Sequence, residues 1–447
     1  MMSIDFSLGS SMKVNETVED IPLSYVSHEP FYIQGNEMML EYAETEDWPG
    51  TGASDNPIII EGYYFECKVH VFTVSGTTLH FIFRNNILDG IDEQWCVIVF
   101  SNVANAVVDK NIIINGAVGA HIMMTNHTVI SNNNIYGQSW DAVYMETDCY
   151  YNVIEDNYFH DLYEAGVWSW NGCSDNIVRN NVIHNVLYGV SFQDNTPRNS
   201  IINNSIFNTT VAGIYTSCNE TTISLNKIHD IKADGINIKS RLNTVDRNWI
   251  YHTGGYGIHM FDTSGENHIN NNTFIKNECG AIRLRDSDHN NILSNNFFEN
   301  GMPQIYDTGL ENNYCYNYWH EEQGDDLNND GYYDTIYSIP GLAGSEDPSP
   351  KTQPSAPMPS WYDFQNVSYP MRSITPTTST YTTHNGITST TSTAPDTSIQ
   401  ESTTMTTHST LSSIPESSDI LVPIITASVV VLVLIGGVLL AKKLIGK

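Results

Sequence analysis

The chain has 447 residues, with 19 Lys and Arg against 51 Asp and Glu, and a formal net charge of −32 at pH 7. Such a surface repels phosphate groups, so the composition argues against a protein that binds nucleic acid and favours interaction with divalent cations. The seven cysteines include no Cys-x-x-Cys pair, which argues against a zinc ribbon or a thioredoxin-type site.

Residues 1–56 are expected to form an N-terminal cap, and residues 57–320 contain a repeat with a period of 21–25 residues. In each copy an Asn is preceded by an aliphatic residue and followed by an apolar one. Later in the copy, a small residue precedes a branched aliphatic residue. This pattern predicts three short strands per copy with Asn- and Gly-rich corners, and no segment has helical spacing. The asparagines in phase are Asn86, Asn111, Asn133, Asn157, Asn181, Asn204, Asn226, Asn248, Asn272, Asn296 and Asn317.

A coil of three strands accounts for this period, which is too short for a propeller blade and lacks the L-x-x-L-x-L pattern of leucine-rich repeats. Each strand then pairs with its equivalent in the next coil about 4.8 Å away, and the aliphatic columns form one continuous core. The in-phase Asn is expected to turn inward and to hydrogen-bond the backbone, which is a structural role.

The repeated pattern N-x-I…x-G-I, the opening phrase WPGTGASDNPIIIEGYYF and the closing phrase NYWHEEQGDDLNNDGYYDTIYSIPG resemble right-handed parallel β-helix proteins. The likeness is to the NosD-like branch of the carbohydrate-binding and sugar-hydrolase group. It implies an all-β, right-handed, single-stranded parallel β-helix of about 11 coils. Because that fold hosts lyases, hydrolases, epimerases, adhesins and a copper-site maturation factor, it implies no single function.

The residue after each branched aliphatic residue is expected to point outward, so that these residues form one face of the rod. Tyr144, Trp168, Trp170 and Tyr215 lie on this face. Their rings suit the stacking of sugar rings, and the predicted ligand is a polysaccharide or glycoconjugate. Two alternatives are that the rings merely cover the sheet, or that they meet a surface protein partner.

Polar residues at one end of this face are candidates for catalysis. A polysaccharide lyase needs a cation for the uronate carboxylate and a base for the α-proton, whereas a glycoside hydrolase needs two carboxylates. No spacing selects a pair, and stacked opposite charges on a sheet are often solvated ion pairs. The candidates are Lys239, His259, Asp262, Arg283, Arg285 and Asp286.

A second outward column contains histidines. His160 and His184 lie on adjacent coils and could share a transition metal, although surface histidines without a metal fit the same pattern. The whole column is Tyr136, His160, His184, Phe207, His229 and Tyr251.

Cys149 and Cys173 occupy equivalent positions of adjacent coils. A separation of about 4.8 Å lies within the Cα range of a disulfide. We therefore predict a disulfide if the protein is exported, and free thiols if it is not.

Residues 321–371 are expected to form a C-terminal cap that contains the acidic stretch DDLNNDGYYD. Asp326, Asn328, Asp330 and Asp334 offer oxygen ligands at a spacing that can wrap a structural Ca²⁺ ion, with Gly331 at the tight turn. A plain acidic turn is the alternative. No organic cofactor is expected.

The rest of the chain predicts a membrane anchor. Residues 372–419 are rich in Ser and Thr and suit a disordered, glycosylated stalk, and residues 420–441 contain no charge and would span about 33 Å as a helix. Residues 442–447 would then be a cytoplasmic tail, with the β-helix outside a single-pass cell membrane protein. The first residues do not form a signal peptide, so we expect the true start to lie upstream.

Three functions remain open from the sequence. The first is a membrane-anchored cell-surface protein that binds carbohydrate or another surface polymer through its aromatic face. The second is an extracellular polysaccharide lyase or glycoside hydrolase. The third is a structural adhesin or surface-layer component, and a NosD-like role in metal-centre maturation is a further alternative.

Overall fold

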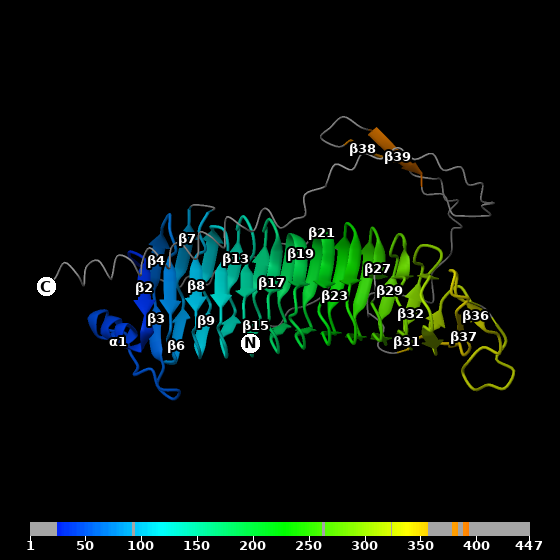
Figure 1. Cartoon of the computed structure of the whole chain (residues 1–447), viewed down its shortest axis with the longest axis horizontal. Coiled ribbons are helices and arrows are strands. Elements are labelled where there is room, and N and C mark those ends of the chain that lie inside the picture. Colours follow the sequence, from blue (N-terminus) through cyan, green and yellow to red (C-terminus); the bar gives the residue numbers. More distant parts are fainter. Residues whose placement is uncertain are drawn as a thin grey trace, which may run out of the picture. The chain divides into compact units, whose positions relative to one another are not determined.

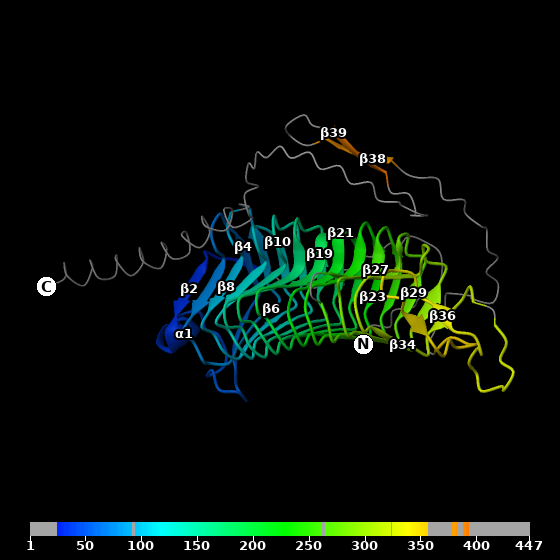
Figure 2. The same ribbon diagram turned by 45° about the vertical axis from the view of Figure 1, so that its right-hand side comes forward.

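The computed structural model describes residues 25–91, 94–261, 264–322, 324–355, 378–382 and 388–392. The chain divides into two compact units, Met1–Val367 and Ser368–Lys447. The first unit is a solenoid of parallel strands, in which each strand pairs with its equivalents in the coils before and after it (Figures 1 and 2). This arrangement confirms the predicted all-β parallel solenoid.

The strands form three ladders, which we name A, B and C. Ladder A contains β1 (Val26–Ser27), β4 (Tyr63–Glu66), β7 (Ile87–Gly90), β10 (Ile112–Asn115), β13 (Asn134–Tyr136), β16 (Tyr158–His160), β23 (Lys227–Ile231), β26 (Trp249–Thr253), β29 (Thr273–Ile275), β32 (Asn296–Phe298) and β35 (Tyr318–Trp319). Two long strands, β19 (Val182–Phe192) and β21 (Ser205–Thr216), run through the corner and belong to both ladders A and B.

Ladder B contains β2 (Phe31–Gln34), β5 (Phe72–Ser75), β8 (Ile98–Ser101), β11 (Ala120–Met123), β14 (Val143–Glu146), β17 (Ala165–Trp170), β24 (Asp234–Ile238), β27 (Tyr256–Phe261), β30 (Gly280–Arg285) and β33 (Ile305–Asp307). Ladder C contains β3 (Ile58–Glu61), β6 (Phe81–Arg84), β9 (Ala106–Asp109), β12 (Val129–Ser131), β15 (Val153–Glu155), β18 (Ile177–Arg179), β20 (Ser200–Ile202), β22 (Thr222–Ser224), β25 (Thr244–Asp246), β28 (His268–Asn270), β31 (Asn291–Leu293) and β34 (Asn313–Cys315).

The core is the stack of inward side chains from the three ladders. In most three-residue strands of ladder C the middle residue is buried, whereas its neighbours are half-buried or exposed, as in Ile154 of β15 and Val178 of β18. This alternation follows from the two-residue period of a strand. The buried residues form a continuous cluster from Phe31 to Ile339.

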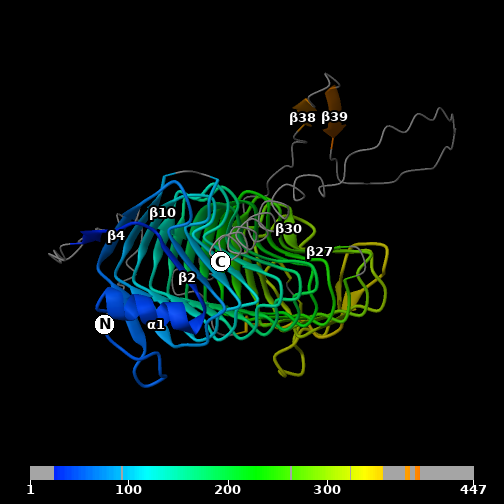
Figure 3. The same ribbon diagram turned by 60° about the vertical axis from the view of Figure 1, so that its left-hand side comes forward.

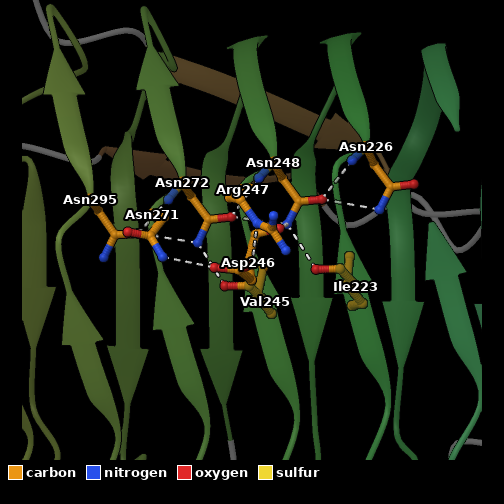
Figure 4. Close-up of polar contacts among 9 residues, drawn as sticks. All are labelled: Ile223, Asn226, Val245, Asp246, Arg247, Asn248, Asn271, Asn272 and Asn295. Carbon is orange, nitrogen blue, oxygen red and sulfur yellow. Dashed lines mark hydrogen bonds and ion pairs between the residues drawn. The ribbon is translucent and has the colours of Figure 1, made fainter. Parts of the chain in front are cut away.

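The in-phase asparagines form a buried column inside a corner of the coil (Figure 4). The Oδ1 atom of Asn181 accepts hydrogen bonds from the backbone N and the Nδ2 of Asn157, each at 3.0 Å. The Nδ2 of Asn181 donates to the backbone oxygen of Ile154 at 2.9 Å. One residue differs from the sequence prediction, because Asn295 and not Asn296 accepts from Asn272. A second column at another corner includes Asn152, Asn176 and Asn199.

A column of small residues lets successive coils approach closely at the start of ladder B. Gly166, Gly189, Gly213, Gly235 and Gly257 occupy its centre. A Cβ atom added to Gly189 would lie 2.5 Å from the backbone oxygen of Gly213 and 2.4 Å from a methyl group of Ile206. The sequence pattern of a small residue before a branched aliphatic residue therefore has a steric cause.

Replacing Gly189 by Ala is expected to lower the free energy of unfolding by about 2 kcal/mol, because the obstructing oxygen belongs to the hydrogen-bonded backbone and cannot move alone. Chemical denaturation of the full chain measures this loss. The reverse change, Ala281→Gly at the end of the same column, should cost about 1 kcal/mol or less. Equal losses for the two variants would contradict the steric explanation.

Both ends of the solenoid are covered. Helix α1 (Gly35–Thr45) lies at the first coils and buries Met39 and Ala43 (Figure 3). Strands β1 and β2 precede it and already belong to ladders A and B, so the solenoid begins inside the segment predicted as a cap. At the other end lies the hairpin of β36 (Tyr337–Ser338) and β37 (Glu346–Asp347). There the carboxylate of Asp347 accepts from Asn317 and ends the Asn column.

The second unit contains one described feature, an antiparallel hairpin of β38 (Thr378–Thr382) and β39 (Thr388–Ser392). This hairpin falls within the segment predicted to be a disordered stalk. In the described part of the chain, we find no helix of the length and apolar character needed to cross a membrane. The predicted single-pass membrane location is therefore not supported. Residues 420–441 and 442–447, on which it depended, lie outside the described residues.

Candidate active site

The outer face of ladder B carries one column of side chains in register. The pairing places Tyr144, Trp168, Ser191, Tyr215, Asn237, His259, Arg283 and Tyr306 on successive coils. Residues that are 22–24 positions apart in the chain are thus direct neighbours in space. The column has an aromatic half and a polar half, which meet at Tyr215 and Asn237.

The aromatic half consists of rings that contact one another edge to face. Trp168 and Tyr188 have ring centroids 6.0 Å apart at an interplanar angle of 90°, and Tyr188 and Tyr215 are 6.2 Å apart at 68°. The small, buried Ser191 lies in register between Trp168 and Tyr215. All three rings are half-buried, and burial raises the pKa of both tyrosines. Because no ring in this group stacks flat on another, their faces do not cover each other.

The other two predicted rings lie differently. Tyr144 stacks on His121 at 4.9 Å and 17°, so one of its faces is covered. Trp170 is half-buried and lies two residues after Trp168 in β17. In the strand register it stands next to Glu146 of the preceding coil. We therefore define the aromatic platform as Trp168, Tyr188 and Tyr215.

The polar half centres on a histidine that is oriented by a carboxylate. The Nδ1 atom of His259 lies 3.1 Å from Oδ2 of Asp234. The other carboxylate oxygen of Asp234 accepts from the backbone N of Tyr256 at 2.7 Å. The guanidinium of Arg283 lies 5.6 Å from the centre of the Tyr256 ring, and burial raises the pKa of Tyr256.

Three buried polar atoms in this half have no hydrogen-bond partner among the described residues. They are Oδ1 of Asn237, Nε2 of His259 and Nε of Arg283. These residues occupy the same column on three consecutive coils. Buried polar groups are normally hydrogen-bonded, so a run of unpaired ones indicates a site that another molecule completes.

The structure brings together only part of the predicted catalytic set. His259 and Arg283 are adjacent, whereas Lys239, Arg285 and Asp286 are exposed. The guanidinium of Arg285 lies over the ring of Phe261 at 5.8 Å. Asp262 lies outside the described residues.

Tyr188, Asp234 and Tyr256 were not predicted from the sequence as site residues. All three lie two residues before the branched aliphatic residue, at the corner where ladder B begins. The predicted outward positions all follow the aliphatic residue, so these three residues fell outside the predicted face. Other coils carry a small residue at this upstream position, namely Ala165, Ala212 and Gly280. The contrast is visible in the sequence and could have identified the three larger residues.

The chain matches the family described as "Right handed beta helix region" over residues 67–228 and 169–298, which together cover more than half of its length. The chain belongs to the right-handed β-helix family. No curated protein matches this β-helix. The match does not test the NosD-like branch, which stays a prediction.

Several solved structures are similar to this β-helix. One is the A-module of the mannuronan C-5 epimerase AlgE6 of Azotobacter vinelandii, at 13% identity and a TM-score of 0.48, covering 57% of this chain and 82% of the module. A variant of the periplasmic alginate epimerase AlgG has 15% identity and a TM-score of 0.45, covering 67% and 74%. The DFA-IIIase of Arthrobacter chlorophenolicus A6 has 10% identity and a TM-score of 0.47, covering 65% and 90%.

The histidine column on ladder A of the β-helix is a continuous ring stack. The rings of His160 and His184 lie 5.5 Å apart at 12°, and those of His229 and Tyr251 lie 4.7 Å apart at 6°. Stacked rings cover each other's faces, so this column does not offer a second sugar platform.

The ring nitrogens of this column are engaged in hydrogen bonds. Nδ1 of His160 contacts Asp161 at 2.8 Å, and Nε2 of His184 contacts the hydroxyl of Tyr158 at 2.8 Å. Among the described residues, no group of three or more His, Cys, Asp or Glu side chains could hold a metal ion. The structure does not support the transition metal considered at His160 and His184.

The acidic loop of the β-helix is held by its own hydrogen bonds. The carboxylate of Asp326 accepts from the backbone N atoms of Asp330 and Gly331, each at 3.1 Å. Oδ1 of Asn328 accepts from the N of Asp330 at 3.0 Å, and Asp334 accepts from the N of Leu327 at 2.7 Å. The side chains therefore shape a tight turn, and structural Ca²⁺ at this loop stays a prediction.

Cys149 and Cys173 are buried neighbours on adjacent coils, and both are free thiols in this structure. The disulfide expected for an exported protein stays a prediction. The two sulfur atoms also lie within hydrogen-bonding distance of carbonyl oxygens: Sγ of Cys149 is 3.3 Å from that of Ile122, and Sγ of Cys173 is 3.1 Å from that of Trp170. The hydrogen bond between the two thiols, together with burial, raises the pKa of Cys149.

Proposed function

We propose that the outer face of ladder B binds an extended polysaccharide or glycoconjugate chain that lies along the axis of the solenoid. The supporting observation is the aromatic platform, whose half-buried rings contact one another edge to face and do not stack flat. Ring faces that remain free are the surfaces on which the C–H groups of a sugar stack.

The spacing of the platform fits a linear polymer. Trp168 and Tyr215 are separated by the coil of Ser191, so their backbones lie about 10 Å apart along the axis. That distance is close to the length of a disaccharide unit, so a chain could place alternate sugars on the two rings. Asn237 and His259 continue the column on the next coils with unpaired polar atoms that suit sugar hydroxyls.

The local charge favours a sugar acid over a neutral sugar. The whole chain is strongly acidic, with 51 Asp and Glu against 19 Lys and Arg. On this face, however, Arg283 and Arg285 lie on one strand, β30, and Lys239 follows β24 two coils earlier. A cationic patch on an acidic protein suits the carboxylate of a uronate residue, because Arg forms bidentate pairs with carboxylates.

Replacing Trp168 by Ala is expected to weaken polysaccharide binding about tenfold, which corresponds to about 1.4 kcal/mol. Binding is measured on an array of soluble uronate-containing and neutral glycans and then by titration calorimetry with the best ligand. Tyr136→Ala is the matched control, because that ring lies on ladder A and stacks on His160.

Two results would contradict the proposal: no glycan retained by the wild-type chain, or equal losses in the Trp168 and Tyr136 variants. A loss of self-association in the Trp168 variant, without any glycan binding, would instead support the adhesin or surface-layer alternative with a protein partner.

A second function, acid–base chemistry on a uronate-containing chain, is favoured by the polar half of the column. Asp234 orients His259 through Nδ1 and leaves Nε2 free to take a proton from the substrate. Arg283 can hold the uronate carboxylate, and the half-buried Tyr256 beside it is placed to serve as an acid. These roles belong to a lyase, because the described cluster contains one carboxylate and not the two of a hydrolase.

A further inference from the structure

A thiol, an imidazole and a carboxylate meet on the N-terminal side of the aromatic platform. His121 of β11 lies in the column of ladder B, two coils before Trp168. Its Nδ1 atom lies 3.9 Å from Sγ of Cys96, and its Nε2 atom lies 2.9 Å from Oε2 of Glu146. Cys96 immediately precedes Val97 and β8, so the three groups come from three consecutive coils.

The imidazole is fixed in this arrangement. His121 is only 7% exposed, and its ring stacks on Tyr144. On the other side, the backbone oxygen of Cys96 accepts a hydrogen bond from Nδ1 of His70 at 2.8 Å. Cys96 is half-buried, whereas His121 is buried, so Cys96 is the more accessible of the two residues to a small reactant.

The hydrogen-bond partners of His121 favour its charged form. Burial by itself would lower the pKa of His121, but the hydrogen bonds with Cys96 and Glu146 outweigh it and raise that pKa to about 9. The other titratable groups that face this site are His70, Tyr144 and Asp141, and burial raises the pKa of Asp141. Glu146, whose Oε2 atom lies 2.9 Å from Nε2, is the carboxylate that stabilises an imidazolium at His121.

We propose that Cys96 is the nucleophile of an acyl-transfer site, with His121 as its base and Glu146 as the residue that positions the imidazole. The same roles recur on unrelated folds wherever a thiol, an imidazole and a carboxylate or amide lie in line. The substrate class is an ester of a small acyl group, and the proposal does not depend on carbohydrate binding by the platform.

The reaction balances without any further reactant except water. The thiol proton first passes to Nδ1 of His121, which gives a thiolate–imidazolium pair, and the thiolate then attacks the acyl carbon and forms a C–S bond. The C–O bond of the ester then breaks, and the alcohol leaves with the proton from His121. Water, deprotonated by His121, hydrolyses the thioester and restores the thiol.

The test uses the full chain and p-nitrophenyl acetate, with mass spectrometry to locate the acetyl group. At pH 7, Cys96 should be acetylated at least about tenfold faster than Cys279, although Cys279 is the more exposed thiol. Both thiols are present in one molecule, so the comparison has an internal control. A smaller ratio overturns the proposal.

Two conservative variants test whether Cys96 reacts because His121 and Glu146 activate its thiol or only because that thiol is accessible. His121→Gln should reduce the rate at Cys96 to that at Cys279, while the rate at Cys279 stays unchanged. Glu146→Gln should move the midpoint of the pH–rate profile at Cys96 to higher pH, because the imidazolium loses its carboxylate partner. A wild-type rate in the His121 variant, or an unshifted profile in the Glu146 variant, overturns the proposal.

Discussion

Replacing Asn181 by Ala is expected to lower the free energy of unfolding by roughly 3–5 kcal/mol, because several buried polar groups lose their partners together. The backbone N and Nδ2 of Asn157 both donate to Oδ1 of Asn181, and the backbone oxygen of Ile154 accepts from Nδ2 of Asn181. None of these groups can turn to solvent, because the column lies inside the corner of the coil.

Chemical denaturation of the full chain measures the loss, and Asn313→Ala is the matched control. The Nδ2 atom of Asn313 also bonds an amide of the preceding coil, Oδ1 of Asn291 at 3.1 Å, but Asn313 is exposed. Removing this exposed contact should cost about 0.5 kcal/mol or less. Equal losses would show that the buried column does not hold the coils together. In that case the Asn repeat would need another explanation.

The periodic parts of this molecule could be predicted from the sequence because each coil repeats the same constraint. The side chains of Asn181 and Asn204 each hydrogen-bond backbone groups of the preceding coil. An Asn is therefore needed at the same position of successive coils, and it recurs in the sequence with the period of the coil. The one misassigned position has a local cause. Asn295 and Asn296 stand side by side, and only the register of the coil determines which of them turns inward.

The candidate site was less predictable because its residues do not repeat. Trp168 and Tyr215 directly follow the branched aliphatic residue, so the two-residue alternation of a strand predicts that they point outward. Tyr188 and Asp234 lie at the corner, where β19 and β21 have an irregular register between Val186 and Tyr188. At such a corner the two-residue alternation fails, so the direction of a side chain depends on backbone geometry that spacing alone does not encode.

The sequence also could not distinguish between two kinds of aromatic column. Tyr136 and His160 on ladder A occur with the same period as Trp168 and Tyr215 on ladder B. On ladder A a ring is present on every coil from Tyr136 to Tyr251, so neighbouring rings stack flat at about the strand spacing. On ladder B the small Ser191 interrupts the series and leaves room at the ring faces. The difference lies in the residue between two rings, and the period of the rings does not reveal it.

If the polar half of ladder B acts on a uronate-containing polysaccharide, replacing His259 by Gln should reduce the rate about 10²–10⁴-fold, because the base that takes the α-proton is lost. The glutamine keeps a hydrogen-bonding side chain of similar size beside Asp234, so the fold should be retained. Unsaturated products that absorb ultraviolet light, and new reducing ends, measure the rate.

His229→Gln is the matched control for this change. The Nδ1 atom of His229 contacts Asp230 at 2.7 Å, as that of His259 contacts Asp234, but the His229 ring lies between Phe207 and Tyr251 in the stack of ladder A. A His–Asp pair is therefore present at both positions, and only the one at His259 has a free Nε2 beside Arg283. Equal rates in the two variants would remove the acid–base role. If the wild-type chain binds uronate polymers without turnover, the column of ladder B is a binding surface and not an active site. The same unpaired atoms can hold a sugar acid without abstracting its proton.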